Sequence, residues 1–178
     1  MLSARGVLVT GSFALLVAAL VASTSAMRAA SPSSSSASSA PERVVSLSRQ
    51  VCFGMCPIYD VTLFDDGTLT YEGKEYVKIV GSKTKRLDRA TIARVKKALR
   101  DSGIHALDVH CCDCQDMTDH PTAVIGFAAG GQWKTIVDYH GCGKTPRPVR
   151  ELEETLDTLL GTAEFVGTME ERTRSPRR

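Results

Sequence analysis

The chain has 178 residues, 43% of them hydrophobic and 24% charged, with a formal net charge of +2 at pH 7. This composition fits one globular domain with additional segments at its ends. A net charge so close to zero excludes a partner chosen by overall charge, and we expect no specific nucleic-acid binding.

The first 26 residues have the layout of a secretory signal peptide. Arg5 supplies a positive start, an apolar run covers residues 13–22, and small residues follow at 23–26. An uncleaved membrane anchor is the alternative, but the run falls short of the roughly 20 residues that a spanning helix needs. The first cysteine is Cys52, so the cleavage region offers no acceptor for lipoprotein acylation. We expect an exported protein, periplasmic or secreted, with no transmembrane segment after cleavage.

The next segment, residues 27–41, is rich in Ser, Ala and Pro. Such a composition cannot bury enough apolar area to offset its ordering entropy, so a disordered linker is predicted here. The folded domain is expected over residues 42–166. The arginine-rich end, residues 167–178, is predicted to be a disordered basic tail.

The first half of the domain has the alternation of an antiparallel meander. Four strands are predicted, at residues 44–47, 58–64, 68–71 and 76–80. In the second strand Tyr59, Val61 and Leu63 form the more apolar face, as expected for a sheet with one side against a core. The pair Asp66-Gly67 predicts a tight hairpin, because glycine tolerates a positive φ angle.

The second half begins with a helical period at residues 88–102, where Asp88 suits the N-cap and Gly103 the stop. A cysteine-rich loop follows, and Gly130-Gly131 then joins two predicted strands at residues 122–128 and 132–139. Two prolines open a last helix that Gly161 ends. The apolar stripe of this helix consists of Val149, Leu152, Leu156, Leu159 and Leu160. Three acids, Glu151, Glu153 and Glu154, lie near its positive N-terminal end.

This order of elements predicts an α+β fold. One antiparallel sheet of about six strands should carry both helices on one face, because each element must bury its apolar side against another. Disulfide bonds should staple the domain.

Five short patterns run through the expected domain. They are Arg49-x-x-Cys52-Phe53-Gly54-x-Cys56-Pro57-x-Tyr59, Asp66-Gly67-x-x-x-Tyr71-x-Gly73, Thr118-Asp119-x-Pro121-Thr122, Lys134 with Asp138-Tyr139 before Gly141, and Leu152-Glu153-x-x-x-Asp157. Together they resemble the bacterial family of domain of unknown function 6438 (DUF6438). The resemblance implies an exported or envelope-associated α+β module and supplies no catalytic residues.

Six cysteines in an exported chain predict disulfide bonds rather than thiolate metal sites. Cys52 with Cys56 is the first choice, because Gly54 lets the chain fold back sharply. The loop that this bridge closes is short, so the bridge should stabilise the fold only modestly.

The remaining cysteines leave their pairing open. Cys142 should pair with one cysteine of the cluster at residues 111–114, with Cys114 favoured. Cys111 and Cys112 would then form a vicinal bridge, which is strained and relatively reducible. A redox role of this cluster is therefore an alternative.

A metal site is the other alternative for the same region. Soft ligands are available there: Cys112, Cys114, His140 and Cys142. Against a metal site, the spacing lacks paired Cys-x-x-Cys elements, and an oxidising compartment removes thiols. No cofactor is expected.

The histidines and the loop acids raise the question of general acid–base chemistry. However, Asp119 stands in Thr-Asp-His-Pro, where capping a turn is the commoner role. Neither Gly-x-Ser-x-Gly nor His-Glu-x-x-His accompanies these groups, so we do not expect an enzyme.

Two surface features remain. Lys96, Lys97 and Arg100 belong to a basic segment that could bind an anionic polymer, although a solvated helix face is the simpler interpretation. Trp133 and Tyr139 fall on one face of their strand; core packing is expected, and exposure would mark a binding surface.

The sequence therefore predicts a non-catalytic binding or structural module of the cell envelope, whose partner is an envelope protein or an anionic polymer. The alternative is a redox- or metal-responsive protein that uses the cluster at residues 111–114 with Cys142.

Overall fold

The computed structural model describes residues 40–109, 112 and 119–174, all of which belong to one compact unit. The signal peptide and nearly all of the linker that the sequence predicts lie outside these residues. Within the described part of the chain, no helix is both long and apolar enough to cross a membrane.

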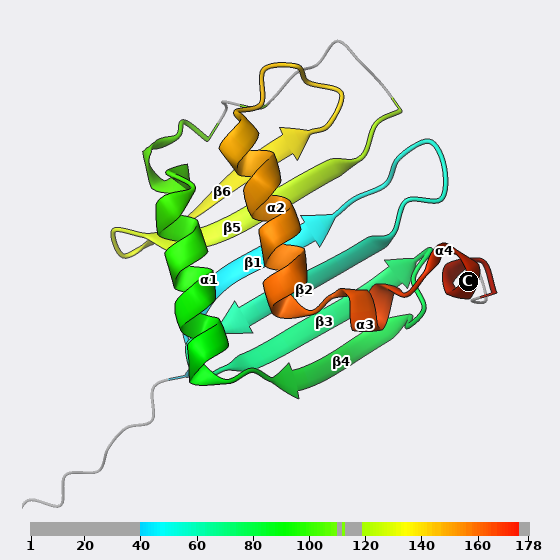
Figure 1. Ribbon diagram of the computed structural model, residues 1–178, viewed down its shortest axis with the longest axis horizontal. Coiled ribbons are helices and arrows are strands. Elements are labelled where there is room, and N and C mark those ends of the chain that lie inside the picture. The colour runs from blue at the N-terminus through cyan, green and yellow to red at the C-terminus, as the bar shows by residue number, and fades with distance from the viewer. Residues whose placement is uncertain (1–39, 110–111, 113–118, 175–178) are drawn as a thin grey trace, which may run out of the picture. The chain divides into compact units, whose positions relative to one another are not determined.

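Six antiparallel strands form one sheet in the order β4-β3-β2-β1-β5-β6 (Figure 1). The strands are β1 (Arg43–Arg49), β2 (Ile58–Phe64), β3 (Thr68–Glu75), β4 (Gly81–Arg86), β5 (Thr122–Ala129) and β6 (Gln132–Tyr139). The first strand of the chain is thus central, and Leu47 lies opposite Val61 of β2 on one side and Ile125 of β5 on the other.

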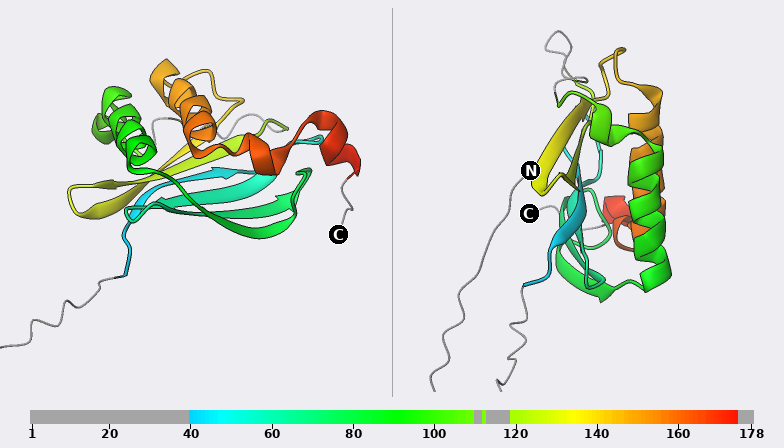
Figure 2. Two further views of the ribbon diagram at one scale, coloured as in Figure 1. Left: turned by 60° about the horizontal axis from the view of Figure 1, so that its bottom comes forward. Right: turned by 90° about the vertical axis from the view of Figure 1, so that its left-hand side faces the viewer.

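Two longer helices cover the same face of this sheet: the left view of Figure 2 shows them side by side, and in the right view α1 lies in front of α2 on the same side of the sheet. The helical elements are α1 (Arg89–Asp101), the 3₁₀ turn η1 (Ile104–Ala106), α2 (Arg147–Leu160), α3 (Ala163–Val166) and α4 (Met169–Arg174). The α+β architecture predicted from the sequence, with both helices on one face, is confirmed.

Local sequence accounts for where these elements begin and end. The Asp88 carboxylate caps α1 by accepting a hydrogen bond from the amide of Thr91 at 2.6 Å. Gly161 ends α2 in the left-handed conformation. In the β2–β3 hairpin, Gly67 has φ +92, and a Cβ there would lie 2.6 Å from the carbonyl oxygen of Leu87, so only glycine fits without strain.

The core lies between the sheet and the two helices. The predicted inner face of β2 is confirmed, because Tyr59, Val61 and Leu63 are all buried. Strands β1 and β5 and both helices supply further fully or nearly fully buried residues: Val45, Leu47, Ile125, Phe127, Val95, Leu99, Leu156 and Leu160. Burying one such side chain contributes roughly 1.5–3 kcal/mol, so this layer dominates the stability of the fold.

One predicted strand is wrong. Residues 76–80 form a turn, and β4 begins only at Gly81. Their apolar side chains serve another purpose: Val77 is fully buried, and the amides of Lys78 and Ile79 donate to the carbonyls of Val166 and Phe165. The segment therefore packs against α3 instead of extending the sheet.

The C-terminal segment is also more ordered than its composition predicts, because helix α4 occupies Met169–Arg174. Thr168 and Glu171 form a reciprocal capping box at its start: the Thr168 amide donates to Glu171, and the Glu171 amide donates to the Thr168 hydroxyl. Glu171 also pairs with Lys78 at 2.8 Å. This helix corrects the prediction of a disordered tail from residue 167.

Candidate functional site

A group of charged side chains meets where β1 and β6 end beneath α2. We call it the α2 charge cluster, and it consists of Arg49, Asp138, His140, Arg150, Glu153 and Asp157. Its two acids on α2, Glu153 and Asp157, are four residues apart and therefore lie on one helical face.

Arg49 links β1 to α2. Its Nη1 donates to Oε2 of Glu153 at 2.5 Å, and its Nη2 donates to Oδ2 of Asp157 at 2.8 Å. Burial alone would lower the pKa of Arg49, but the neighbouring charges of Asp157 and Glu153 outweigh it and raise the pKa. The guanidinium is therefore firmly charged.

Asp157 is held on its other oxygen by two hydroxyl groups. Tyr59 donates to Oδ1 at 2.5 Å, and Thr162 donates to the same atom at 2.7 Å. Burial, together with the charge of Asp157 and the hydrogen bond to it, raises the pKa of Tyr59. With both carboxylate oxygens engaged, Asp157 is a structural anchor.

A second part of the cluster joins β6 to α2. The Nε2 atom of His140 lies 2.9 Å from Oε2 of Glu153 and 3.8 Å from Oδ2 of Asp138. Asp138 accepts a hydrogen bond from Thr145 at 2.5 Å and another from Arg150 at 3.3 Å. One ligand atom each from Asp138, His140 and Glu153 lies within 4.8 Å of the other two.

Glu153 occupies the most unusual environment in the cluster. Its side chain is only 1% exposed, and desolvation raises the pKa of its carboxyl despite the nearby charge of Arg49. Its Oε1 atom is buried and has no hydrogen-bond partner among the described residues. A buried carboxylate oxygen without a partner is costly, so this atom requires an explanation.

A pocket of about 450 Å³ opens beside the cluster. Arg49, Tyr59, His140 and Asp157 form its polar part, while its rim comes from the loop after β1 and from α3: Cys56, Pro57, Ala163, Val166 and Gly167. This volume lies in the range of small-ligand sites, which typically combine apolar walls with a few polar groups.

The loop between β1 and β2 lies at the edge of this pocket. Cys52 and Cys56 form a disulfide, as the sequence predicts. The loop exposes three apolar side chains, Val51, Phe53 and Met55, and Phe53 is 87% exposed.

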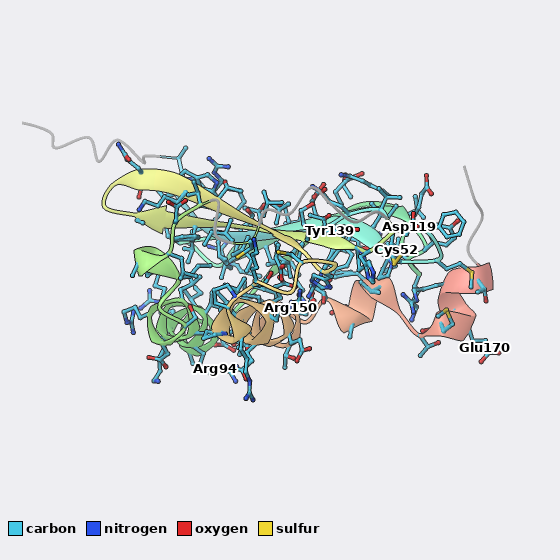
Figure 3. All side chains as sticks on the ribbon, turned by 90° about the horizontal axis from the view of Figure 1, so that it is seen from above. Cys52, Arg94, Asp119, Tyr139, Arg150 and Glu170 are labelled. Atoms are coloured by element: carbon cyan, nitrogen blue, oxygen red, sulfur yellow. A yellow bond between two sulfur atoms is a disulfide. The ribbon has the colours of Figure 1, made fainter. Side chains whose placement is uncertain are left out.

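The rest of the fold also holds this loop. The amide of Phe53 donates to the carbonyl of Asp119, and Figure 3 shows Cys52 and Asp119 together at this end of the sheet. Asp119 has φ +81, a left-handed conformation that is uncommon for a residue other than glycine. The disulfide within the loop and the hydrogen bond to Asp119 thus hold the loop in place, while its apolar side chains face solvent.

The other predicted disulfides involve Cys111 and Cys114, which lie outside the described residues, so those pairings stay predictions. Cys112 and Cys142 are both disulfide-bonded and buried. Neither therefore offers a thiolate for the metal site predicted from Cys112, Cys114, His140 and Cys142. The redox alternative, which depends on a reducible bridge, stays a prediction. His140 faces carboxylates instead.

The basic residues Lys96, Lys97 and Arg100 are exposed on α1. Acids lie near them: Lys97 pairs with Asp101, and Lys96 and Arg100 line a hollow that also contains Glu42 and Asp65. These acids reduce the local positive charge, and anion binding at this face stays a prediction.

Trp133 and Tyr139 lie on the sheet face opposite the helices and are partly buried. The guanidinium of Arg43 covers the Trp133 ring at 4.1 Å, and the Tyr139 hydroxyl accepts a hydrogen bond from the amide of His120. Core packing, the expected role, is wrong for this pair, since both have local partners outside the core.

Within the α2 charge cluster, sequence reasoning assigned chemistry only to His140, as a metal ligand beside cysteines, although Arg49, Asp138, Glu153 and Asp157 also stand in the patterns described above. A further signal lies in the helical period. Glu153 follows Val149 by four residues and precedes Leu156 by three, so it lies on the apolar stripe of α2.

Fold and site together define an antiparallel α+β domain with a partly buried charge cluster, a pocket beside it and a stapled apolar loop at the pocket's edge. The family model of DUF6438, a domain of unknown function, matches residues 43–160, and the chain belongs to this family. No curated protein matches the chain.

Proposed function

We propose that this protein is an exported, non-catalytic binding module. Its binding surface is the loop at residues 51–56 together with the pocket beside it, and its partner is a protein of the cell envelope or the extracellular space. The observation that carries the proposal is the 87% exposure of Phe53 on a loop that a disulfide holds in place.

The chemistry of the loop supports a protein partner. An aromatic and two other apolar side chains gather within five residues, Val51 to Met55, and all are exposed. Aromatic residues and methionine are enriched at protein interfaces, where a few large side chains carry most of the binding energy. Because the disulfide holds this loop before binding, little conformational entropy is lost when a partner docks.

The pocket supports binding rather than catalysis. Asp157 uses both of its oxygens within the protein, and the Tyr59 hydroxyl donates to it. A general base needs a free lone pair, and Asp157 and Tyr59, which are engaged with each other, are not placed to supply one. The pocket is suited to receive a side chain of the partner while Phe53 packs against the partner's surface.

Export is supported by the signal-peptide layout of residues 1–26 and by the disulfide chemistry. Cys52, Cys56, Cys112 and Cys142 are all disulfide-bonded. Disulfides persist in oxidising compartments and are rare in the cytosol.

Site-specific crosslinking tests the proposal. Phe53 is replaced with p-benzoylphenylalanine, and Val137, an exposed apolar residue on β6, receives the same group as the matched control. After irradiation of cells, we expect a discrete protein adduct in the envelope or the medium from position 53 and none from position 137. Adducts from both positions, or none from position 53, contradict the proposal.

A second variant tests the role of the staple. Replacing Cys52 and Cys56 with serine should cost about 2 kcal/mol or less of stability, because the closed loop is so short. The domain should stay folded by circular dichroism, while the yield of the position-53 adduct falls. An unchanged yield would show that loop preorganisation does not contribute to binding.

A further inference from the structure

We propose that Asp138, His140 and Glu153 form a binding site for one divalent transition-metal ion of the zinc or cobalt type. The site lies between the end of β6 and the first half of α2, and it is separate from the apolar loop. The proposal goes beyond the binding function proposed above and does not depend on it.

Geometry is the first argument. Ligand atoms bound at about 2.0–2.2 Å from a zinc ion lie roughly 3.0–3.5 Å from one another. In the structure Nε2 of His140 is 2.9 Å from Glu153 Oε2 and 3.8 Å from Asp138 Oδ2, and all three ligand atoms fall within 4.8 Å. Small side-chain rotations would bring them around one ion.

The unpartnered Oε1 atom of Glu153 is the second argument. It belongs to a side chain that is 1% exposed, and it lacks a hydrogen-bond partner in the described part of the chain. A metal ion bound to the Glu153 carboxylate would supply the missing interaction. Buried charges are normally paired or bound to a metal, and a metal accounts for this atom directly.

The charges of the cluster are the third argument. Three carboxylates, those of Asp138, Glu153 and Asp157, face two guanidinium groups, those of Arg49 and Arg150. The cluster thus holds more carboxyl groups than guanidinium groups. A bound cation offsets this excess in a place from which bulk water is largely excluded.

The two arginines need not leave when an ion binds. Arg49 would retain its hydrogen bonds to Asp157, because Oδ2 of Asp157 accepts from Nε of Arg49 at 3.3 Å and from its Nη2 at 2.8 Å. Arg150 would retain the hydrogen bonds that its Nη2 donates to the backbone carbonyls of His140 and Cys142, at 3.1 and 2.9 Å. Each guanidinium thus has a second anchor that does not involve the proposed ligands.

The ligand set selects the class of metal. One imidazole with two carboxylates suits zinc and its neighbours in the first transition row, whereas calcium requires six to eight oxygen ligands. His140 is 28% exposed and lines the pocket. The remaining coordination positions of the ion would therefore face the pocket.

Metal titration tests the proposal. The chelator-treated, disulfide-intact chain without a polyhistidine tag is titrated with Zn²⁺ by calorimetry and with Co²⁺ by visible absorption. We expect binding of one equivalent, a d–d absorption band for Co²⁺, and a rise in Tm on adding Zn²⁺, since a ligand that binds only the folded state stabilises it.

The variant His140→Ala removes one ligand at a partly exposed position and should weaken binding at least tenfold. The matched control is His120→Ala, an exposed histidine near the same end of the sheet, and it should bind like the wild type. Glu153→Gln should also weaken binding, and circular dichroism verifies that each variant is folded. Absence of binding by the wild type, or equal binding by the wild type and His140→Ala, overturns the proposal.

Failure of this site and failure of the binding surface can be told apart. Phe53→Ala removes the aromatic side chain of the proposed binding surface but leaves the three ligands intact, so it should leave the Zn²⁺ titration unchanged. His140→Ala should weaken metal binding at least tenfold in a folded protein, whatever the loop binds.

Discussion

Helices α1 and α2 pack side by side on one face of the same sheet, yet they meet it differently. α1 turns an uncharged stripe to the core, with Thr91, Ile92, Val95 and Leu99 buried. α2 buries four apolar residues, and it adds Glu153, which is as deeply buried as they are. The charges of α1 lie in solvent, whereas α2 carries charge into the interior.

This difference separates a structural helix from one that builds a site. An exposed pair such as Lys97–Asp101 on α1 gains little, because water screens it and two long side chains must be ordered. Glu153 cannot rely on water, so it requires Arg49 and His140 from other elements. Desolvated charges of this kind are found where a protein binds or reacts more often than where it merely packs.

The largest effect should come from breaking the buried ion pair. Arg49→Ala leaves Glu153 and Asp157 without their cation and should destabilise the domain by about 3–5 kcal/mol. Lys97→Ala on α1 is the control and should change the free energy of unfolding by no more than about 0.5 kcal/mol. Urea denaturation followed by circular dichroism measures both. Similar small losses for the two variants would remove the distinction between the helices.

Apolar truncation should show what the two helices share. Leu99→Ala on α1 and Leu156→Ala on α2 each remove a buried side chain and should each cost about 2–5 kcal/mol, because both leave a cavity. Denaturant midpoints at equal m-values give the comparison. If Leu156→Ala were nearly neutral while Leu99→Ala was costly, α2 would be held by its charges and not by its stripe.

The smallest effect concerns the cap of α1. Hydrogen bonds from Thr91 lower the pKa of Asp88 below its ordinary value of 3.8. A carboxyl with a lowered folded-state pKa contributes stability above its unfolded pKa and loses it as the pH falls through the folded pKa. Asp88→Asn keeps the capping oxygen but does not titrate. The stability difference between wild type and variant should therefore shrink as the pH is lowered below about 4, and a constant difference would contradict this assignment.

Most of the fold follows from local sequence. The alternation in β2, the two glycine hairpins and the cap of α1 each need only a few neighbouring residues to specify them. The predicted strand at residues 76–80 fails because its apolar content is equally compatible with packing against α3, which only the folded chain reveals.

The candidate site was less accessible to sequence reasoning. The acids at the start of α2 were interpreted as favourable charges near a helix N-terminus, whereas Glu153 is buried against Arg49. Their partners are far away in the chain: 104 residues separate Arg49 from Glu153 and 98 separate Tyr59 from Asp157. No short sequence motif can specify contacts between residues so far apart in the chain. The position of Glu153 on the apolar stripe nevertheless marks this residue as unusual.

The central position of β1 has a consequence for how the domain folds. β1 is the first strand to be synthesised, and β2 can pair with it at once. The other edge of β1, however, can pair only after β5 has been synthesised, because Leu47 lies opposite Ile125 there. Arg49 can contact Glu153 only after α2 has been synthesised. Contacts of such long sequence separation slow folding, because loop closure must precede them. The central strand therefore stays half-paired until nearly the whole domain is available.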